Sequence, residues 1–312
     1  MPQHSLSKQY LSSLIKTQAK SDGFFDCGIS KAEYLKDDAT NMEEWLSQGY
    51  NGEMGYLKRN KEKRYNPVLL VENAKSVITV LYNYYSRQNL SKTDNYKISR
   101  YAYGEDYHYV IKDKLHKLLG TIKEKVGNCN ARVFVDSAPV LDRAWARRSG
   151  LGFVGKNTLI INKKGGSFFF IGHIIIDLEL QYENDVDPLT YCGSCTKCID
   201  ACPTSAIKEN YVDARSCLSY LTIEYTGELP MELKDRFNDW VFGCDICQDV
   251  CPWNRFSSPH EEPLFEPSEN LLNMRKPQWK EMGKPEFNNL FKNSAVQRTG
   301  YFGLKRNIDF LK

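Results

Sequence analysis

Apolar residues in the first half of the chain recur at helical or strand spacing. Residues 3–20 place their apolar positions on one helical face, and Gly23 can end that helix. Thr40 and Glu43 have the spacing of a capping box, which predicts that a second helix begins there. A longer helix follows residue 106, because one face collects five apolar positions: Tyr107, Ile111, Leu115, Leu118 and Ile122.

Strand-like segments lie between the predicted helices. Residues 76–82 are rich in Val, Ile and Thr, which is typical of a buried strand. Residues 132–135 predict another strand, which ends at Asp136. Pro139 fits the first turn of a helix, where its missing N–H costs nothing, so a helix is expected over residues 137–150.

Two more strands and a turn complete this part of the pattern. Strands are expected at residues 158–162 and 167–176, and the segment Lys-Lys-Gly-Gly at 163–166 is a good hairpin signal between them. Helices and strands therefore alternate through residues 1–185, which predicts an α/β or α+β domain. We expect a cysteine-rich domain at 186–260 and a proline-containing tail that packs on the surface at 261–312.

The cysteine-rich domain contains two related runs. The first reads C-x2-C-x2-C-x3-C-P, the ferredoxin spacing for [4Fe–4S] clusters, at Cys192, Cys195, Cys198 and Cys202. The second is shorter and also ends in Cys-Pro, with Cys244, Cys247 and Cys251. Its leading cysteine is missing, because Val241 stands in that position. Cys217, between the runs, can replace it.

Eight cysteines are enough for two cubane clusters. In two-cluster ferredoxins the fourth cysteine of each run binds the other cluster. That rule assigns one cluster to Cys192, Cys195, Cys198 and Cys251, and the other to Cys202, Cys217, Cys244 and Cys247. A pair of structural zinc sites is the alternative, but zinc requires neither the third cysteine of the run nor the Cys-Pro ending. A disulfide framework is disfavoured because nothing at the N-terminus looks like a signal peptide.

Composition and charge add little to this picture. The 312 residues are 41% hydrophobic and 26% charged with a net charge of +3, as in an ordinary soluble protein, and no apolar run has the length of a membrane helix. The basic run at 58–64, which includes Arg59 and Arg64, is either a solvated face or a phosphate contact. The other two cysteines, Cys27 and Cys129, are expected to be small core residues.

A glycine-rich segment at 150–158 imitates two nucleotide-binding motifs. It contains G-x-G-x-x-G and is one residue away from a Walker A loop, but Asn157 stands where Ser or Thr must bind magnesium. Both phosphate loops lead from a strand into a helix, whereas this segment leads from a helix into a strand. A nucleotide site is therefore not predicted, although glycines still let the backbone approach a bulky ligand closely.

Taken together, the motifs resemble the epoxyqueuosine reductase family. The resemblance covers about residues 5–260 and rests on VDSAPV at 135–140, Arg143, GLGFVGKNT at 150–158, the two cysteine runs with their flanks, and SCLSYLTIE at 216–224. The family is related to reductive dehalogenases. Its longer members carry a helical-repeat extension after the clusters that helps to grip tRNA, so this chain resembles a short form. Arg275, Lys276, Lys305 and Arg306 are candidates for replacing that grip.

The resemblance implies a cobalamin enzyme that acts on tRNA. It would remove the epoxide oxygen of epoxyqueuosine at wobble position 34 of a tRNA with a GUN anticodon. The two clusters would take electrons from a low-potential donor such as flavodoxin or ferredoxin and pass them to cobalt, and cob(I)alamin would attack the epoxide. The family binds cobalamin base-off without a histidine ligand; here the corrin signature D-x-H-x-x-G is absent, and His108 fits an ordinary histidine at a helix start. A cytoplasmic monomer is expected.

The resemblance also implies site residues. Asp136 matches the family's proton donor, but a helix beginning directly after it would stabilise the charged carboxylate, and a helix cap is the alternative role. The implied cobalamin contacts are Arg59, Arg64, Tyr101, Asp136, Lys156, Asn157, Thr158, Ser167, Ser219 and Asp245. Three other functions stay open: a dehalogenase-like enzyme acting on a small molecule, an iron–sulfur electron carrier, and a tRNA-binding scaffold with structural clusters.

Overall fold

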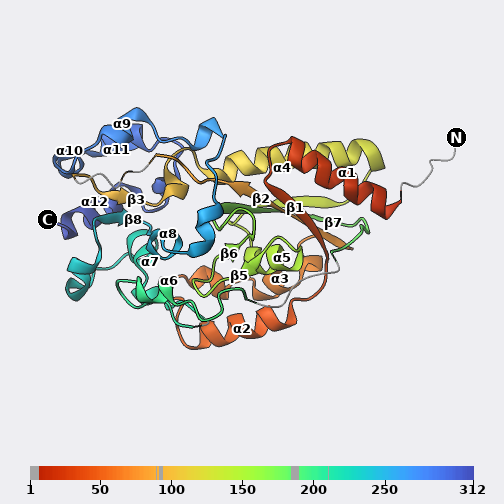
Figure 1. Cartoon of the computed structure of the whole chain (residues 1–312), viewed down its shortest axis with the longest axis horizontal. Helices are drawn as coiled ribbons and strands as arrows, with labels where there is room; N and C mark the ends of the chain where they lie inside the picture. Colours follow the sequence, from red (N-terminus) through yellow and green to blue (C-terminus); the bar gives the residue numbers. More distant parts are fainter. Residues whose placement is uncertain (1–6, 89, 91–93, 184–189, 210) are drawn as a thin grey trace.

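An antiparallel sheet organises the first half of the molecule (Figure 1). The structure is a computed structural model that describes residues 7–88, 90, 94–183, 190–209 and 211–312. The sheet has the strand order β1-β2-β7-β4, and every neighbouring pair is antiparallel. Its strands are β1 (Asp26–Lys31), β2 (Ser76–Asn83), β7 (Phe169–Ile176) and β4 (Ala131–Phe134).

Helices cover both faces of this sheet. Helices α1 (Lys8–Ser21) and α4 (Tyr107–Val126) lie on one face, and α5 (Asp142–Arg148) lies on the other, with α2 (Lys36–Ser47) and α3 (Lys61–Tyr65) on the same side (Figure 1). Strand β2 is buried on both sides, because Ile78 and Val80 pack with α1 and α4 while Val77 packs with α5. This two-sided burial explains the continuous apolar run in the sequence.

Some elements agree with the pattern, and one boundary does not. Helices α1 and α4 and strand β2 lie where the periodicity predicted them. The capping box at Thr40 is wrong, because α2 begins at Lys36. Thr40 lies inside the helix, and its hydroxyl donates to the carbonyl of Lys36 at 3.1 Å. A hydroxyl that bonds back to the preceding turn cannot cap the helix start.

The segment after β4 differs most from the prediction. The helix expected over 137–150 begins only at Asp142, so residues 136–141 form a loop. Asp136 has φ +48°, in the left-handed region, and this turns the chain away from the strand. The amide of Ser137 then donates to the carbonyl of Val135 at 2.5 Å. Asp136 is therefore a loop residue and not the cap of α5.

The expected hairpin at 158–176 is only partly formed. Its turn is present, because the backbones of Asn162 and Gly166 bond to each other in both directions at 2.8 and 3.0 Å. The strands on either side separate, since β6 (Ile160–Ile161) pairs with β5 (Phe153–Val154) whereas β7 joins the main sheet. Side-chain burial in the central sheet outweighs the local hairpin signal.

Short elements surround the cysteines. Helices α6 (Lys197–Asp200) and α8 (Ile246–Asp249) contact each other, and α7 (Leu218–Ile223) packs against β8 (Trp240–Phe242). Strand β8 pairs in parallel with β3 (Lys97–Ile98), which ties this region to the first half of the chain. The 3₁₀ turns are η1 (Gly55–Lys58), η2 (Pro67–Leu69), η3 (Arg100–Ala102), η4 (Ala214–Ser216), η5 (Met231–Arg236), η6 (Pro252–Phe256), η7 (Pro263–Phe265) and η8 (Ala295–Arg298).

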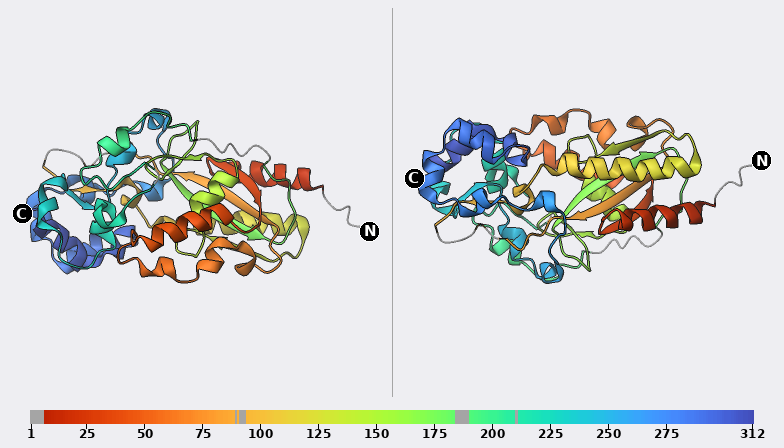
Figure 2. Two further views of the ribbon diagram at one scale, coloured as in Figure 1. Left: turned by 90° about the horizontal axis from the view of Figure 1, so that it is seen from below. Right: turned by 90° about the horizontal axis from the view of Figure 1, so that it is seen from above.

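The C-terminal segment is helical and has a hydrophobic core. Its helices are α9 (Glu269–Asn273), α10 (Lys276–Glu281), α11 (Lys284–Leu290) and α12 (Gly300–Phe310). Trp279 and Leu304 are fully buried and pack with Tyr96 and with Val241 and Phe242 of β8. Figure 2 shows these helices at the opposite end of the molecule from α1. The segment thus contributes a core, whereas the sequence predicted a surface tail.

Three further points from the sequence can be compared with the structure. Val241, where the second cysteine run lacks its first member, is a fully buried core residue of β8 and faces hydrophobic partners. The domain boundary expected at 185–186 lies outside the described residues. No helix among the described residues is long and apolar enough to cross a membrane.

Candidate functional site

The first set of cysteines predicted to bind one cluster lies together. Burial raises the pKa of the Cys251 thiol, and the charges of Cys192 and Cys195 nearby raise it further. Burial likewise raises the pKa of Cys198, and Cys192 and Cys251 add to the effect. The run at the start of the cluster region (residues 190–209 and 211–260) therefore meets the last cysteine of the second run, as the crossed ligand pattern requires.

The second set also lies together. Burial raises the pKa of Cys247 well above its usual range, and the charges of Cys244, Cys217 and Cys202 contribute after it. Cys244 is affected in the same way by Cys217 and Cys202. Cys217 thus lies near Cys202, Cys244 and Cys247, which is consistent with its predicted replacement of the cysteine missing at Val241. The chemistry of both sets fits iron–sulfur clusters, and the ligand role of each cysteine stays a prediction.

No group of three or more His, Cys, Asp or Glu side chains in the described ranges is placed to hold a single metal ion.

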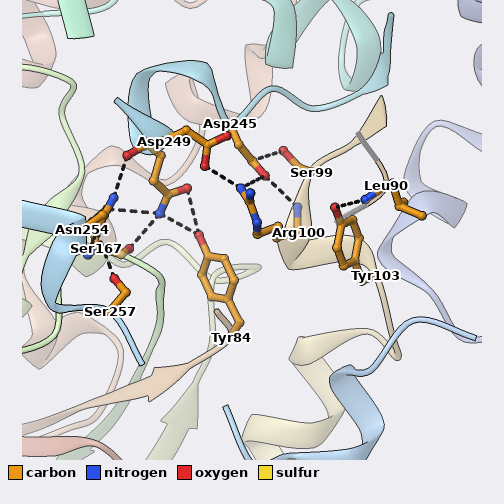
Figure 3. Close-up of polar contacts among 11 residues, drawn as sticks. Tyr84, Leu90, Ser99, Arg100, Tyr103, Ser167, Asp245, Asp249, Asn254 and Ser257 are labelled. Atoms are coloured by element: carbon orange, nitrogen blue, oxygen red, sulfur yellow. Dashed lines mark hydrogen bonds and ion pairs between the residues drawn. The ribbon is translucent and has the colours of Figure 1, made fainter. Parts of the chain in front are cut away.

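A buried arginine joins the cluster region to the sheet region (residues 7–88 and 94–183). Arg100 forms ion pairs with Asp245 at 3.3 Å and with Asp249 at 2.6 Å, and only 11% of its side chain is exposed (Figure 3). Ser99 donates to Asp245 at 2.5 Å. Asp245 lies between the ligand candidates Cys244 and Cys247, so these contacts fix the backbone that carries the second cysteine set.

A second group of polar contacts crosses the same interface. The side-chain oxygen of Asn254 accepts hydrogen bonds from the amide and the hydroxyl of Ser167, at 2.7 and 3.2 Å (Figure 3). Asn157 donates to the carbonyl of Cys247 at 3.2 Å, and Lys156 donates to the carbonyl of Gly193 at 3.0 Å. The glycine-rich segment therefore lies against both cysteine runs.

These contacts locate four of the predicted cobalamin residues. Lys156, Asn157, Ser167 and Asp245 lie at the interface between the sheet and cluster regions, and each has a protein partner there. Ser219 lies in the first turn of α7, two residues after Cys217, and is partly buried. Their contacts with a corrin stay predictions.

Asp136 and the start of α4 form the acid–base centre of the site. The hydroxyl of Tyr107 donates to Oδ2 of Asp136 in a short hydrogen bond. Nε2 of His108 lies 3.6 Å from the same oxygen, and Nδ1 of His108 lies 2.6 Å from Oδ1 of Asp106. Asp106 is the N-cap of α4, which orients the histidine ring between two carboxylates.

The protonation states of Asp136 and His108 depend on burial and on their neighbours. Burial by itself would raise the pKa of Asp136, but the nearby His108, the hydrogen bond from Tyr107 and the charge of Arg298 lower it below its usual value. Burial by itself would lower the pKa of His108, but the hydrogen bond to Asp106 and the nearby carboxylate of Asp136 raise it to about 9. At neutral pH the proton of this pair therefore resides on the histidine.

Charged and aromatic residues from several elements surround Asp136. Its side chain is 61% exposed, although these residues lie within electrostatic range of it. They are Tyr56, Arg64, Tyr101, Tyr107, His108, Arg143 and Arg298. An exposed carboxylate with protein groups on several sides is accessible to a ligand, and we name Asp136 together with these residues the Asp136 cavity.

The cavity contains cationic groups that suit a large polar ligand. Arg64 is buried at 9% exposure, and its Nε has no hydrogen-bond partner among the described residues. Arg143 is exposed to the cavity and donates through Nη1 to the carbonyl of Thr158, which has φ +62°. Arg59, the other arginine predicted from the basic run, is exposed. A buried donor without a partner favours a ligand that accepts a hydrogen bond.

Comparisons with known proteins place the chain in a family. A model described as "4Fe-4S double cluster binding domain" matches residues 191–254, and one described as "Epoxyqueuosine reductase QueG, DUF1730" matches residues 64–137. An epoxyqueuosine reductase from Cellulophaga algicola is 53% identical over 307 residues, with 98% of this chain and 99% of that protein covered. This chain belongs to the epoxyqueuosine reductase family.

Solved structures of epoxyqueuosine reductases share the whole fold. A crystal structure of an epoxyqueuosine reductase with an epoxyqueuosine-modified tRNA-Tyr stem loop matches with a TM-score of 0.88 and 30% identity. The match covers 96% of this chain and 80% of that one. A catabolic reductive dehalogenase matches at 15% identity with a TM-score of 0.50, which is a likeness of fold alone.

The family assignment confirms the expected fold class, and the chain is a reductase with a domain for two [4Fe–4S] clusters. Sequence reasoning missed some members of the Asp136 cavity. It treated His108 as an ordinary helix-start histidine, and it did not consider Tyr56 or Arg298. The Asp-Tyr-His order at 106–108 was a usable signal for the histidine. No local signal connects Arg298 with Asp136, which lies 162 positions earlier in the sequence.

Proposed function

We propose that this chain reduces the epoxide of epoxyqueuosine at position 34 of tRNA to the alkene of queuosine. The observation that carries the proposal is the Asp136 cavity, in which a carboxylate and a protonated imidazole meet, in a chain that also brings together two sets of four cysteines. The reaction consumes two electrons and two protons and releases the epoxide oxygen as water. A reductase therefore needs both an electron path and a proton source, and the chain contains groups suited to both.

Cobalamin is the cofactor that we assign to the Asp136 cavity. The buried Arg64 with its unpartnered Nε, together with Arg143 and Tyr101, would hold its polar periphery. When bound, it supplies a cobalt centre that collects the single electrons delivered by the clusters. The interface residues Lys156, Asn157 and Ser167, which contact the cluster region, would bind another part of the cofactor.

The proton source is the pair formed by His108 and Asp136. An alkoxide is a poor leaving group, so the epoxide oxygen must be protonated as its C–O bond breaks. In the open cavity Asp136 is ionised and His108 carries the proton. When a substrate excludes water from Asp136, the cost of its charge rises, and the proton moves from Nε2 of His108 to Oδ2 of Asp136 once the occupied site shortens their 3.6 Å separation to hydrogen-bond length. Asp136 then donates it to the epoxide oxygen.

The structure of the loop removes one objection to this role. If α5 began directly after Asp136, the helix N-terminus would hold the carboxylate in its charged form. Because α5 begins at Asp142, the carboxyl of Asp136 is free of that effect, and its pKa depends on His108, Tyr107 and the ligand. Asp136 is thus suited to donate a proton in the occupied site.

We also propose the electron donor, the substrate, the compartment and the oligomeric state of the enzyme. A low-potential protein such as flavodoxin or ferredoxin supplies the electrons one at a time to the clusters. The substrate is a tRNA with a GUN anticodon, and the enzyme works in the cytoplasm as a monomer. Turnover with purified flavodoxin in place of a chemical reductant tests the donor.

Anaerobic turnover tests the proposed function. Protein reconstituted with iron, sulfide and cobalamin is given a low-potential reductant and tRNA that contains epoxyqueuosine, and the digested nucleosides are analysed by mass spectrometry. We expect loss of one oxygen from the base in the wild type and a rate lower by about 100-fold or more in Asp136→Asn. Absence of conversion with cobalamin bound and the clusters reduced would overturn the proposal.

A further inference from the structure

The C-terminal segment is fixed to the rim of the Asp136 cavity. The carbonyl of Asn293 accepts a hydrogen bond from the amide of Asp106 at 2.6 Å, next to the acid–base centre. Ser294 donates to the carbonyl of Ala102 at 3.3 Å. On the other side of η8, the hydroxyl of Thr299 donates to the carbonyl of Thr222 at 3.3 Å. The turn η8 is thus held at both ends, and its last residue is Arg298.

Arg298 is oriented by two side chains. Its Nε and Nη2 bind the two carboxylate oxygens of Glu224 at 2.6 and 3.0 Å, which is a bidentate pair. Its Cζ lies 5.6 Å from the centre of the Tyr56 ring, so the guanidinium also rests on an aromatic face. Even so, 56% of the side chain is exposed. An arginine held on one edge and one face can offer the rest to a ligand without further ordering.

Arg298 faces the same cavity as the acid–base centre. Its positive charge contributes to the lowered pKa of Asp136, so the two side chains are within electrostatic range. Tyr56 is 37% exposed and is influenced by Glu224, Arg298 and Asp136 together. Tyr56 and Arg298 are therefore exposed members of the Asp136 cavity and are accessible to a polymer substrate whose modified base reaches Asp136.

An exposed aromatic ring follows Arg298 by four positions in the chain. Phe302, in the first turn of α12, is 76% exposed, whereas residues of the same helix such as Leu304 are fully buried. The ammonium of Lys284 lies 5.8 Å from its ring centre, and the ring of Tyr301 lies 5.3 Å away. Exposed aromatic rings beside cationic groups are typical of surfaces on which unpaired bases stack.

The basic residues expected to grip RNA are engaged elsewhere. Arg306 donates to the carbonyls of Tyr225, Gly227 and Leu221 at 2.6 to 2.9 Å. Lys276 pairs with Asp239 at 2.8 Å. Lys305 and Arg275 bind backbone carbonyls within the C-terminal helices. Their contacts support the fold of the segment, which leaves Arg298 as the arginine of this segment placed at the cavity.

We propose that Arg298 and Phe302 form a contact surface for the RNA strand that flanks the modified nucleotide. This inference rests on the proposed function and deepens it. Arg298, held by Glu224 and Tyr56, binds a phosphate of the anticodon loop, and Phe302 stacks with an unpaired base next to it. The short C-terminal segment thereby takes part in substrate binding.

The chain contains a matched control for Arg298. Arg215 forms the same bidentate pair with Asp213, at 2.9 and 2.8 Å, and lies 5.3 Å above the ring of Tyr50. Its side chain is 52% exposed. It shares the chemistry of Arg298 and makes no contact with the Asp136 cavity among the described residues. Arg215→Gln therefore reports what the loss of an exposed, stacked ion pair does by itself.

Binding of a labelled anticodon stem-loop RNA tests the proposal. The cluster-loaded protein is titrated against RNA with epoxyqueuosine at position 34, and fluorescence anisotropy is followed at several salt concentrations. We expect Arg298→Gln to weaken binding roughly 10-fold and to reduce the slope of log K against log salt by about 1, since one phosphate contact is lost. Phe302→Ala is expected to weaken binding at least about 5-fold with little change of slope.

The controls separate this proposal from the proposed function. Arg298→Lys keeps the charge and is expected to keep the salt slope while losing part of the affinity. Cluster absorbance and thermal unfolding show that each variant is folded. Unchanged affinity and slope in Arg298→Gln, or an equal loss in Arg215→Gln, would overturn the proposal even if turnover is normal. Wild-type protein that binds the RNA through Arg298 but does not reduce it would instead overturn the proposed function.

Discussion

Nε2 of His108 lies 3.6 Å from Oδ2 of Asp136, and Nδ1 of the same ring lies 2.6 Å from Oδ1 of Asp106. The imidazole is therefore placed between two carboxylates, and 25% of its side chain is exposed. One carboxylate caps α4 and is fixed, while the other stands on a loop at the cavity. Asp106 orients the ring, and Asp136 is the carboxylate through which a proton of His108 can pass to a substrate.

This relationship predicts the pH dependence of the reaction. The pKa of His108 is raised to about 9, so the imidazolium persists at neutral pH and is lost as pH rises through about 9. We expect the single-turnover rate of reduced enzyme to fall above that pH. In His108→Gln the fall is expected to disappear and the rate at pH 7 to drop by roughly 100-fold. Rate measurements between pH 6 and 10 check this.

A control histidine makes the pH experiment specific. His116 lies on the exposed face of α4, so His116→Gln is expected to retain the wild-type profile. Nuclear magnetic resonance of the imidazole carbon protons gives the titration of His108 independently of activity. A His108 signal that titrates near the pKa of an unperturbed histidine would contradict the role of His108 as the proton source.

The grouping of cysteines predicts an asymmetric loss of iron. Cys217 lies outside both runs but joins Cys202, Cys244 and Cys247 in space. We expect Cys217→Ser to lose the second cluster and to lower the iron content from about eight atoms per chain towards about four. Iron analysis and electron paramagnetic resonance of the reduced protein measure this. Cys129→Ser, a matched control outside both sets, should keep the full content.

The unpartnered donor of Arg64 predicts a role in cobalamin binding. Removing a charged donor from a buried contact costs roughly 10-fold or more in affinity. We therefore expect Arg64→Gln to raise the dissociation constant for hydroxocobalamin by about that factor, measured by titration of the protein with its clusters loaded. Arg59→Gln is the comparison, since Arg59 is exposed and belongs to the same basic run. Equal affinities of the two variants would refute the assignment.

The C-terminal core predicts a large effect on stability. Trp279 is fully buried, and its indole N–H donates to Asn95 at 2.7 Å. Trp279→Ala should lower the free energy of unfolding by about 3–5 kcal/mol, because it leaves a cavity and an unpaired amide. Met231→Ala, at a side chain 68% exposed, should change it by less than about 1 kcal/mol. Urea unfolding under anaerobic conditions, followed by tryptophan fluorescence and circular dichroism, gives both values. A small effect of Trp279→Ala would favour a surface tail.

The sequence by itself determined the features that depend on local spacing. The periodicity of apolar residues predicted α1, α4 and β2, since the side-chain repeat of a helix or strand is a local property. The two cysteine runs predicted a double cluster domain because a cubane requires thiolates at short fixed intervals. The motifs around Asp136 and Gly150 also pointed to the family that the comparisons then showed.

Tertiary structure alone decided how distant segments meet at the site. The left-handed turn at Asp136 delays α5 to Asp142, and only the packing of the loop against α4 places His108 beside it. The C-terminal segment folds as helices because Trp279 and its neighbours bury apolar surface against β8. No local pattern in the sequence predicts this burial. The same packing of the C-terminal segment brings Arg298 into electrostatic range of Asp136. Contacts between residues far apart in sequence depend on how the buried faces fit together, and that fit exists only in the folded chain.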